Sequence, residues 1–328
     1  MNLRWKKGDI YLMSDVITIG EAMIAFDPHN TGPMRFVNNF QKKVGGAELN
    51  VAIGCARLGI KAGWISRLGD DEFGRYIYNF ARGEGIDVSG VSFVKGYPTS
   101  LNFKEILSDG EVQTFYYRDK SPILSMTPNE LDEAQFEKAK ILHITGIFPA
   151  INKENNMKII NKSIKLAEKY KLKISFDPNI RLKMWSKEEA RETLSQILPH
   201  VDILLTGDKE MEVIVGEKDP DKILEAIKPY NISFVGIKQG DKGAVGYSES
   251  RKLYVPPVKS KVVDTVGAGD GFNVGVLYGY LNNWDLEKTL LYANTIGSMV
   301  VGVQGDNEGL PFLEEVQAKL GETEILDR

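Results

Sequence analysis

The sequence has very few of the residues that form disulfides or structural metal sites. Cys55 is the single cysteine among 328 residues, which excludes an internal disulfide and leads us to expect a reducing, cytoplasmic location. The three histidines are scattered and leave no ligand set for structural zinc. Apolar runs of the roughly 18 residues that cross a bilayer are also missing. We therefore expect neither a disulfide scaffold nor a membrane-spanning protein.

Charge of one sign is not concentrated in any segment. The chain has 41 Lys and Arg against 45 Asp and Glu, a net charge of −4, and its basic runs are short. This balance argues against nucleic acid as a partner. An apolar content of 42% is enough to build a core, and the length allows one large domain or two smaller ones.

A regular pattern begins only at residue 16. Residues 1–13 carry Arg4, Lys6 and Lys7 and lack an apolar segment. We expect residues 1–13 to be an N-terminal extension, with a second translation start at Met13. Residues 14–328 are expected to form one α/β domain.

Short β-branched runs alternate with helical patterns through most of this domain. The runs predict strands at 16–19, 63–66, 141–145, 173–176, 201–205 and 233–237. Apolar residues at helical spacing predict helices at 48–58, 72–84, 154–170 and 187–198. In the C-terminal third, a helix rich in small residues is expected to follow the segment 267–271 through Tyr280, and another to run from Leu286 to about Val301. This alternation indicates an α/β fold with a mostly parallel sheet that helices cover on both faces.

Two stretches interrupt the alternation, at about 21–44 and 97–119. The first contains Thr31-Gly32-Pro33 and alternating apolar residues. The second predicts a hairpin, with strands at 100–107 and 111–118 on either side of the turn signal Asp109-Gly110. We expect the two stretches to form one small β-lid outside the main sheet.

The segment Gly267-Ala268-Gly269-Asp270-Gly271 is the strongest sign of chemistry, at an expected strand-to-helix junction. Glycines permit close backbone approach, and the helix that follows points free N–H groups and its positive dipole end at the turn. Such a turn binds anions, and Asp270 could accept the proton of an alcohol there. Read locally, a simple helix N-cap explains the same residues equally well. Phe272 replaces the third glycine of the dinucleotide fingerprint, and no P-loop motif occurs.

Four motifs in order resemble the signatures of the ribokinase-like carbohydrate kinases, the phosphofructokinase B family. They are GGAELNVA at 45–52, GDDEFG at 69–74, KQGDKG at 238–243 and DTVGAGDGF at 264–272. The resemblance covers residues 15 to about 318. It implies a Rossmann-like ribokinase fold with a β-lid, ATP as phosphate donor, Mg²⁺, and transfer to a sugar hydroxyl. It leaves a requirement for a monovalent cation open.

The resemblance also assigns roles to residues within these motifs. It implies that Asp270 is the catalytic base and that the amides of Gly267, Ala268 and Gly269 form the anion hole. It places Gly45, Gly46 and Asn50 at the sugar, and Lys238, Gly240, Gly243, Gly267, Gly269 and Asn294 at the nucleotide.

One position departs from the family pattern. Gly207 stands where the family often has the Asn of an Asn-x-x-Glu motif near the metal, whereas Glu210 is retained. Glu210 is therefore the candidate for a role at the metal. The alternative for Glu210 is an exposed acid in the first turn of a helix, where the helix dipole favours it.

The choice of sugar depends on a few polar and aromatic residues. Arg181 follows a strand end, where ligands bind in open α/β sheets, and Tyr116 and Arg118 share one face of the second lid strand. Together with Asp306 they resemble the acid-binding set of 2-keto-3-deoxygluconate kinases. Phe103 stands where a further tyrosine is expected in that set, and its ring could pack on the sugar. A carboxylate needs a charge partner once water is excluded, so two arginines favour a sugar acid over fructose.

The predicted function is thus ATP-dependent phosphorylation of 2-keto-3-deoxygluconate at its terminal hydroxyl, giving the 6-phosphate. Fructokinase, or another small-sugar kinase of this fold, is the nearest alternative. A non-catalytic sugar- or nucleotide-binding module and a Rossmann dehydrogenase are alternatives of other classes. We expect a homo-oligomer, either a dimer through the lids or a larger assembly.

Overall fold

The computed structural model describes residues 14–107 and 111–323. The predicted extension at residues 1–13 and the predicted Asp109-Gly110 turn lie outside the described residues. The division of the chain into an extension and one domain stays a prediction.

The main sheet has nine strands in the order β13-β12-β11-β10-β9-β8-β1-β4-β5. Its strands are β1 Val16–Ile19, β4 Ala62–Gly69, β5 Val91–Val94, β8 Ile141–Thr145, β9 Lys173–Asp177, β10 Ile203–Gly207, β11 Phe234–Lys238, β12 Ala244–Ser248 and β13 Arg251–Val255. All neighbours from β5 to β11 pair in parallel, whereas β12 and β13 add an antiparallel edge. The predicted mostly parallel sheet is confirmed.

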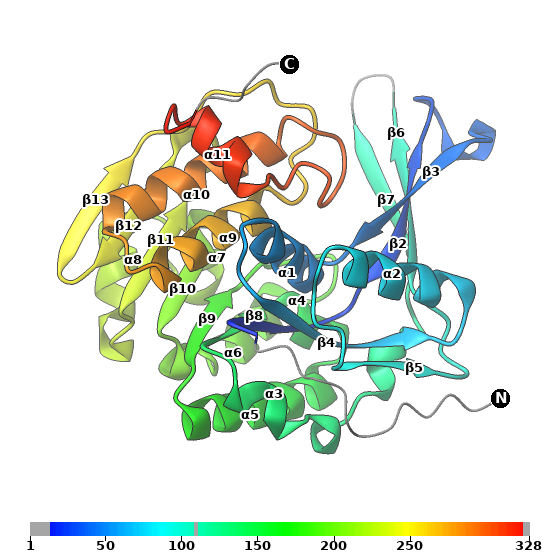
Figure 1. Ribbon diagram of the computed structural model, residues 1–328, viewed down its shortest axis with the longest axis horizontal. Helices are drawn as coiled ribbons and strands as arrows, with labels where there is room; N and C mark the ends of the chain where they lie inside the picture. Colours follow the sequence, from blue (N-terminus) through cyan, green and yellow to red (C-terminus); the bar gives the residue numbers. More distant parts are fainter. Residues whose placement is uncertain (1–13, 108–110, 324–328) are drawn as a thin grey trace.

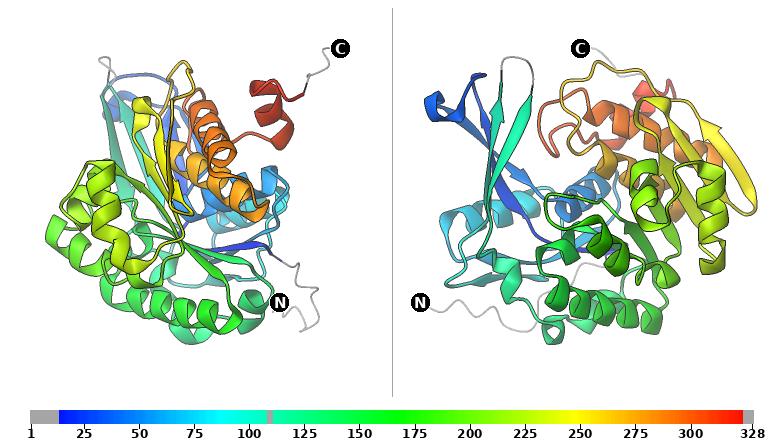
Figure 2. Two further views of the ribbon diagram at one scale, coloured as in Figure 1. Left: turned by 90° about the vertical axis from the view of Figure 1, so that its left-hand side faces the viewer. Right: turned by 180° about the vertical axis from the view of Figure 1, so that it is seen from behind.

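Helices cover both faces of this sheet (Figures 1 and 2). One buried cluster joins it to α1 Ala47–Arg57, α2 Glu72–Gly83, α9 Ala268–Leu281, α10 Leu286–Val300 and α11 Leu313–Lys319. The other cluster joins it to α3 Glu133–Glu137, α4 Ile147–Ile151, α5 Lys153–Tyr170, α6 Lys187–Leu194, α7 Asp208–Ile214 and α8 Pro220–Ile227. The core therefore consists of two apolar layers, as expected for a parallel sheet buried on both sides.

The segment before the glycine turn is not the strand that the sequence suggested. β13 ends at Val255, and residues 256–267 run as an irregular connection to α9. Pro256 and Pro257 offer no N–H to a sheet ladder. The amides of Val263 and Asp264 donate instead to the carbonyl of Val301, just after α10. The turn is thus anchored to the loop that follows α10.

A separate four-stranded sheet stands beside α2, and it is the predicted β-lid (Figure 1). Its order is β3-β2-β6-β7, from β2 Met23–Pro28, β3 Phe40–Gly45, β6 Leu101–Ile106 and β7 Val112–Tyr117. In the β6–β7 register, Asn102 pairs with Tyr116 and Phe103 with Phe115. Because directly paired residues share a face, Phe103 and Tyr116 lie on opposite faces of the lid.

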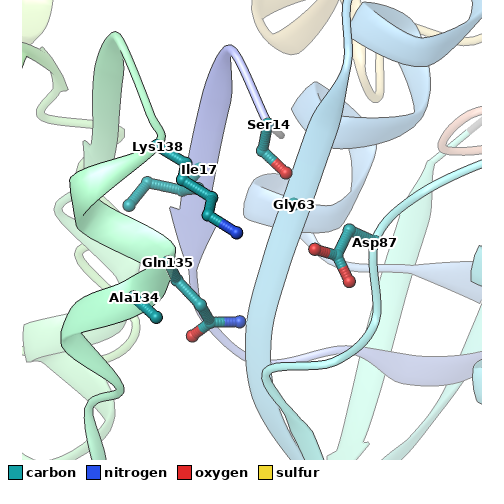
Figure 3. A pocket seen from close by; sticks show the side chains of 7 residues that line it. All are labelled: Ser14, Ile17, Gly63, Asp87, Ala134, Gln135 and Lys138. Atoms are coloured by element: carbon teal, nitrogen blue, oxygen red, sulfur yellow. The ribbon is translucent and has the colours of Figure 1, made fainter. Parts of the chain in front are cut away.

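A small cavity lies between β1, β4 and α3 (Figure 3). Its lining includes Ser14 and Gly63, near the amino ends of β1 and β4, and its volume is about 10 Å³. That volume is close to the minimum for one water molecule, too small for a substrate. Among the predicted site residues, Arg181, Glu210 and Lys238 lie at or just after the opposite, carboxyl ends of β9, β10 and β11. Among the described helices, none is both long and apolar enough to cross a membrane.

Candidate active site

The glycine turn and the first turn of α9 form a backbone site with free donors. Gly267, the N-cap, has φ of +78°, and a Cβ there would lie 2.1 Å from the carbonyl oxygen of Asp306. Only glycine is compatible with both conditions. The N–H of Ala268 donates a long hydrogen bond of 3.5 Å to the Thr265 carbonyl, and the other N–H groups at the start of a helix lack acceptors within it. The turn thus has the amides that an anion hole requires.

Asp270 lies in this first turn and is 6% exposed. Its Oδ2 accepts a hydrogen bond of 2.8 Å from Nδ2 of Asn50, on α1. Asn50 is held in turn by Asn307, whose Nδ2 lies 3.4 Å from the Asn50 Oδ1 and donates to the Val44 carbonyl at 2.6 Å. Asn50 therefore orients the carboxylate of Asp270, although the two residues are 220 positions apart in the sequence.

The surroundings of Asp270 give its carboxyl an unusual proton affinity. Burial raises its pKa to about 7, although the hydrogen bond from Asn50 opposes this rise. The negative charge of Asp177 adds to the rise, whereas the positive charges of Lys238 and Arg181 reduce it. A carboxyl with a pKa near neutrality can both take up and release a proton at physiological pH.

A buried charge pair flanks the turn at the carboxyl ends of β9 and β11. Lys238 Nζ lies 2.9 Å from Asp177 Oδ2 and 3.3 Å from Oδ1 of Asn273, one helical turn after Asp270. Nδ2 of Asn273 donates to the same Asp177 oxygen at 2.6 Å. A Cβ added to Gly269 would lie 3.7 Å from Lys238 Nζ, so this ammonium group borders the turn. The pair places one cation beside the free amides.

The Glu210 carboxylate accepts hydrogen bonds from two backbone amides. Its Oε2 accepts from the N–H of Gly207 at 2.6 Å, and its Oε1 accepts from Ile180 at 3.1 Å. Glu210 therefore caps α7 and also holds the segment that leads to Arg181. Burial, aided by Asp177, raises its pKa, and Lys238 opposes the rise. Among residues 14–107 and 111–323, no group of three His, Cys, Asp or Glu side chains could by itself hold a metal ion.

Three residues predicted at the nucleotide lie around the end of β13. Gly243 has φ of +88°, and a Cβ there would lie 2.3 Å from the Val255 carbonyl oxygen. Asn294 Nδ2 donates to the carbonyls of Val255 and Pro256, at 3.1 and 3.0 Å. Gly240, with φ of +60°, has open space where its Cβ would be. Gly243 and Asn294 thus shape the start of the connection to the glycine turn.

The structure brings Tyr116 and Arg118 together at the end of β7. The Arg118 Cζ lies 5.8 Å from the centre of the Tyr116 ring, which is 51% exposed. Arg118 also forms an ion pair with Glu21, a 3% exposed carboxylate between β1 and β2. Glu21 accepts further hydrogen bonds from Ser100 and Ser121. The charge of Arg118 is therefore already balanced within the protein.

Arg181 differs from Arg118 in this respect. Its side chain is exposed and has no hydrogen bond or ion pair to another described residue. Its positive charge is one of the influences that reduce the rise in the pKa of Asp270. Sδ of Met184, in the same loop, lies 3.9 Å from Arg118 Nη1 and links the two arginine segments.

Phe103 is not brought to this set. Its ring stacks on Phe26 at 4.7 Å and meets Phe40 and Tyr117 edge to face, at 5.5 and 5.8 Å. The cluster lies on the lid face opposite Tyr116, because Phe103 and Tyr116 point in opposite directions from the sheet.

Gly45, Gly46 and Asp306 meet where the lid joins the main domain. A Cβ on Gly45 would lie 2.4 Å from Asp306 Oδ2, and a Cβ on Gly46 would lie 2.5 Å from the Glu21 carbonyl oxygen. Glycine is needed at both positions for the chain to pass. Asp306 is thus in contact with both Gly45 and Gly267.

Sequence reasoning assigned no role to four of the side chains that build this site, namely Glu21, Asp177, Asn273 and Asn307. Asp177 is the last residue of β9, and this position at a carboxyl strand end was the available signal. Asn273 follows the recognised motif directly. Asn307 follows Asp306 in a stretch that the resemblance covered, whereas Glu21 gave no signal, because its role arises only when distant segments pack together.

The chain is similar to known proteins over most of its length. The model of the pfkB family carbohydrate kinases matches residues 13–313. A 2-dehydro-3-deoxygluconokinase of Bacillus subtilis strain 168 is 35% identical over 318 residues, covering 93% of this chain and 95% of the relative. A 5-dehydro-2-deoxygluconokinase of Bacillus licheniformis is 31% identical over 309 residues, covering 92% and 94%.

A solved structure extends the comparison to ligands. A provisionally named ribokinase II of E. coli, in complex with ATP and Mg²⁺, matches with a TM-score of 0.87 and 25% identity, covering 94% of this chain and all of the other. The fold, the family match and the kinase relatives together define a phosphotransferase. The chain belongs to the pfkB family of carbohydrate kinases. It is accordingly an ATP-dependent sugar kinase.

Proposed function

We propose that this kinase phosphorylates the terminal hydroxyl of 2-keto-3-deoxygluconate, also named 2-dehydro-3-deoxygluconate, giving the 6-phosphate. The observation that carries the proposal is Arg181, an exposed guanidinium that forms no hydrogen bond or ion pair with the other residues that the structure describes. A sugar acid would supply the missing negative charge. A neutral sugar would leave this cation without a partner once the site excludes water.

Arg118 would have a supporting part in acid binding. Glu21 balances its charge, so it would contribute directed N–H donors rather than net attraction. Tyr116, Gly45, Gly46, Asn50 and Asp306 complete the proposed sugar site. Phe103 would support the lid from its far face.

Asp270 would act as the general base. Its buried carboxylate would accept the proton of the terminal hydroxyl as the oxygen attacks the γ-phosphate of ATP. Asn50 holds the carboxylate in place throughout, since its hydrogen bond favours the ionised form. Positioning of this kind is the main contribution of a protein to phosphoryl transfer.

The turn at 267–270 would stabilise the transferring phosphoryl group. The amides of Ala268 and Gly269, together with the ammonium of Lys238, would face the charge that develops on its oxygens. Gly240, Gly243 and Asn294 would shape the nucleotide side.

Mg²⁺ would be held chiefly by the phosphates of ATP, because the described residues supply no cage of their own. When bound, the ion neutralises phosphate charge. Glu210 would act on its water shell, since both carboxylate oxygens already accept backbone hydrogen bonds.

A need for a monovalent cation, a homodimer through the lids and a cytoplasmic location stay predictions. Omission of K⁺ and Na⁺ from the assay tests the first, and light scattering the second.

Fructokinase activity is the alternative that the site allows, because Glu21 already balances the charge of Arg118. The test is ATP turnover with Mg²⁺ on 2-keto-3-deoxygluconate, 5-dehydro-2-deoxygluconate, fructose, ribose and adenosine, with Asp270→Asn as control. Preferred turnover of the 2-keto acid, lost in the control, supports the proposal. Preference for fructose would keep the kinase and discard the role of Arg181, and preference for the 5-dehydro acid would keep Arg181 and change the substrate.

A further inference from the structure

Lys104, on lid strand β6, is a buried cation surrounded by carboxylates from three different segments. Its Nζ lies 3.2 Å from Oδ1 of Asp27 on β2, 3.4 Å from Asp306 and 3.8 Å from Asp264. Its side chain is 9% exposed. Asp27 belongs to the lid, whereas Asp264 and Asp306 belong to the loops on either side of α9 and α10. The ammonium group therefore joins the lid to the main domain.

A second lysine strengthens the same junction. Lys43, on β3, lies 3.1 Å from the other Asp27 oxygen and donates to the carbonyl of Gln304 at 2.7 Å. Asp27 is 1% exposed, so it anchors both ammonium groups away from water. Lys43 and Lys104 thus both pair with Asp27, and both contact the loop at 304–306.

The loop that they contact adjoins the reacting groups. The carbonyl oxygen of Asp306 packs against Gly267, and its Oδ2 packs against Gly45, the last residue of β3. The amide of Gly305 also donates to Asp264 Oδ2 at 3.2 Å. A displacement of Asp306 would therefore change both the proposed sugar contact and the wall of the anion-binding turn.

We propose that Lys104 is a positioning residue that holds Asp306 in place for the sugar and couples the placement of the lid to the glycine turn. The proposal rests on the kinase activity but not on which sugar is the substrate. Neither the sequence motifs nor the family resemblance assigns Lys104 a role. Its position in the register, on the same lid face as Tyr116, brings it to the substrate side.

The charges around Asp306 give this role a pH signature. Burial raises the pKa of Asp306, and Lys104 is the cation that opposes the rise. Asp27 and Glu308 add to the rise, Asp264 shares the Lys104 ammonium, and Lys43 lies on the far side of Asp27. Without Lys104, Asp306 would bind a proton at higher pH and lose the charged form that accepts hydrogen bonds from sugar hydroxyls.

The test compares Lys104→Met, the milder Lys104→Gln, the charge-retaining Lys104→Arg and the control Lys42→Met. Lys42 is a neighbouring lid lysine that lies over the ring of Tyr76 on α2. Steady-state kinetics would be measured from about pH 5 to about pH 8, the range in which groups with a pKa near neutrality change charge. The acceptor would be whichever sugar the wild-type enzyme prefers, so a wrong substrate proposal does not affect the outcome.

For Lys104→Met and Lys104→Gln we expect the sugar KM to rise about tenfold or more, with the ATP KM changed less than about twofold. The acid limb of kcat/KM for the sugar should move to higher pH. Lys104→Arg should restore most of the sugar KM, and Lys42→Met should behave like wild type.

Two outcomes would overturn the proposal. One is an unchanged sugar KM and pH profile in Lys104→Gln. The other is an equal loss for sugar and ATP that follows thermal stability and that Lys104→Arg does not restore, which would make the cluster a purely structural junction. If Lys104→Met does not fold, the pH profile and the KM split of Lys104→Gln decide the question.

Discussion

Asn50 on α1 and Asp270 on α9 are joined by a buried hydrogen bond of 2.8 Å. The two helices pack side by side against the same face of the main sheet. Each residue belongs to one of the two most recognisable motifs of the chain, and the contact explains why both motifs occur together. The amide donor of one helix fixes the orientation and the charge state of the carboxyl at the start of the other.

Removal of this donor should change the pH dependence of the kinase. A general base works in its ionised form, so sugar phosphorylation should increase as the pH rises through the pKa of Asp270, about 7. Asn50→Ala removes the hydrogen bond that lowers this pKa, so the acid limb of kcat/KM should move to higher pH. A pH–rate series on both proteins checks the direction.

Glu48 provides the control for this experiment. It is buried beside the site, and burial raises its pKa to about 7 as well. If Asp270 is the group that titrates, Glu48→Gln should leave the acid limb near its original position. An acid limb that disappears in Glu48→Gln and stays at its wild-type position in Asn50→Ala would assign the titration to Glu48 instead.

The raised pKa of Asp270 also predicts a cost in stability. A carboxyl whose pKa is higher in the folded than in the unfolded protein binds its proton more strongly when folded. The free energy of unfolding therefore falls as the pH rises from about 4 to about 7, and the loss remains above that range. Asp270→Asn should unfold at a higher temperature than wild type at pH 8, while its turnover falls about a thousandfold. Thermal unfolding at pH 8 and pH 4 tests this, because the difference should shrink at the lower pH.

The two arginines proposed to bind the sugar should respond differently to truncation. Arg118→Ala leaves Glu21 buried without its cation, so the free energy of unfolding should fall by about 3 kcal/mol. Arg181→Ala removes an exposed side chain and should leave folding almost unchanged. Both should weaken binding of the acid, Arg181→Ala by about 2 kcal/mol. Denaturant titration, combined with KM values for the keto acid and for fructose, separates the two effects.

A result of equal acid KM in wild type and Arg181→Ala would remove the carboxylate argument. Arg181→Lys is the matched variant, since it keeps the charge and loses the planar fork of donors. Partial retention of acid binding in Arg181→Lys would show that charge is the larger contribution.

The sequence predicted the elements that have a strong local signal. The six predicted strands of the main sheet and the hairpin of the lid were found within a few residues, because their apolar periodicity is strong. β5, β12 and β13 were missed: β5 and β13 lie at the sheet edges and carry exposed residues, which weakens the pattern. The expected strand before the glycine turn was wrong, because the amides of Val263 and Asp264 donate to the carbonyl of Val301 after α10 rather than to a neighbouring strand.

The residues of the candidate site also divide into those that lie in recognisable motifs and those whose contacts form only on folding. Asp270, Asn50 and Lys238 lie in motifs and could be named, although their roles at the substrate stay predictions. The pairing of Arg118 with Glu21 could not be anticipated, since the two residues are 97 positions apart. The position of Phe103 on the far face of the lid depends on the β6–β7 register, which a hairpin sequence alone does not fix.

The two glycines of the turn allow folding and catalysis to be separated. Gly267 has a positive φ and no room for a Cβ, so Gly267→Ala should lower both the free energy of unfolding and the activity.

Gly269 lies in the helix, and the nearest atom to an added Cβ is Lys238 Nζ at 3.7 Å, an ordinary contact distance. Gly269→Ala should therefore fold as well as wild type or better. Its methyl group, placed between the free amides and Lys238, should reduce kcat by about a hundredfold, as loss of one anion-hole donor does. Thermal unfolding and ATP turnover, measured side by side on the two variants, test this difference. Full activity of Gly269→Ala would show that the phosphoryl group does not approach the turn at this residue.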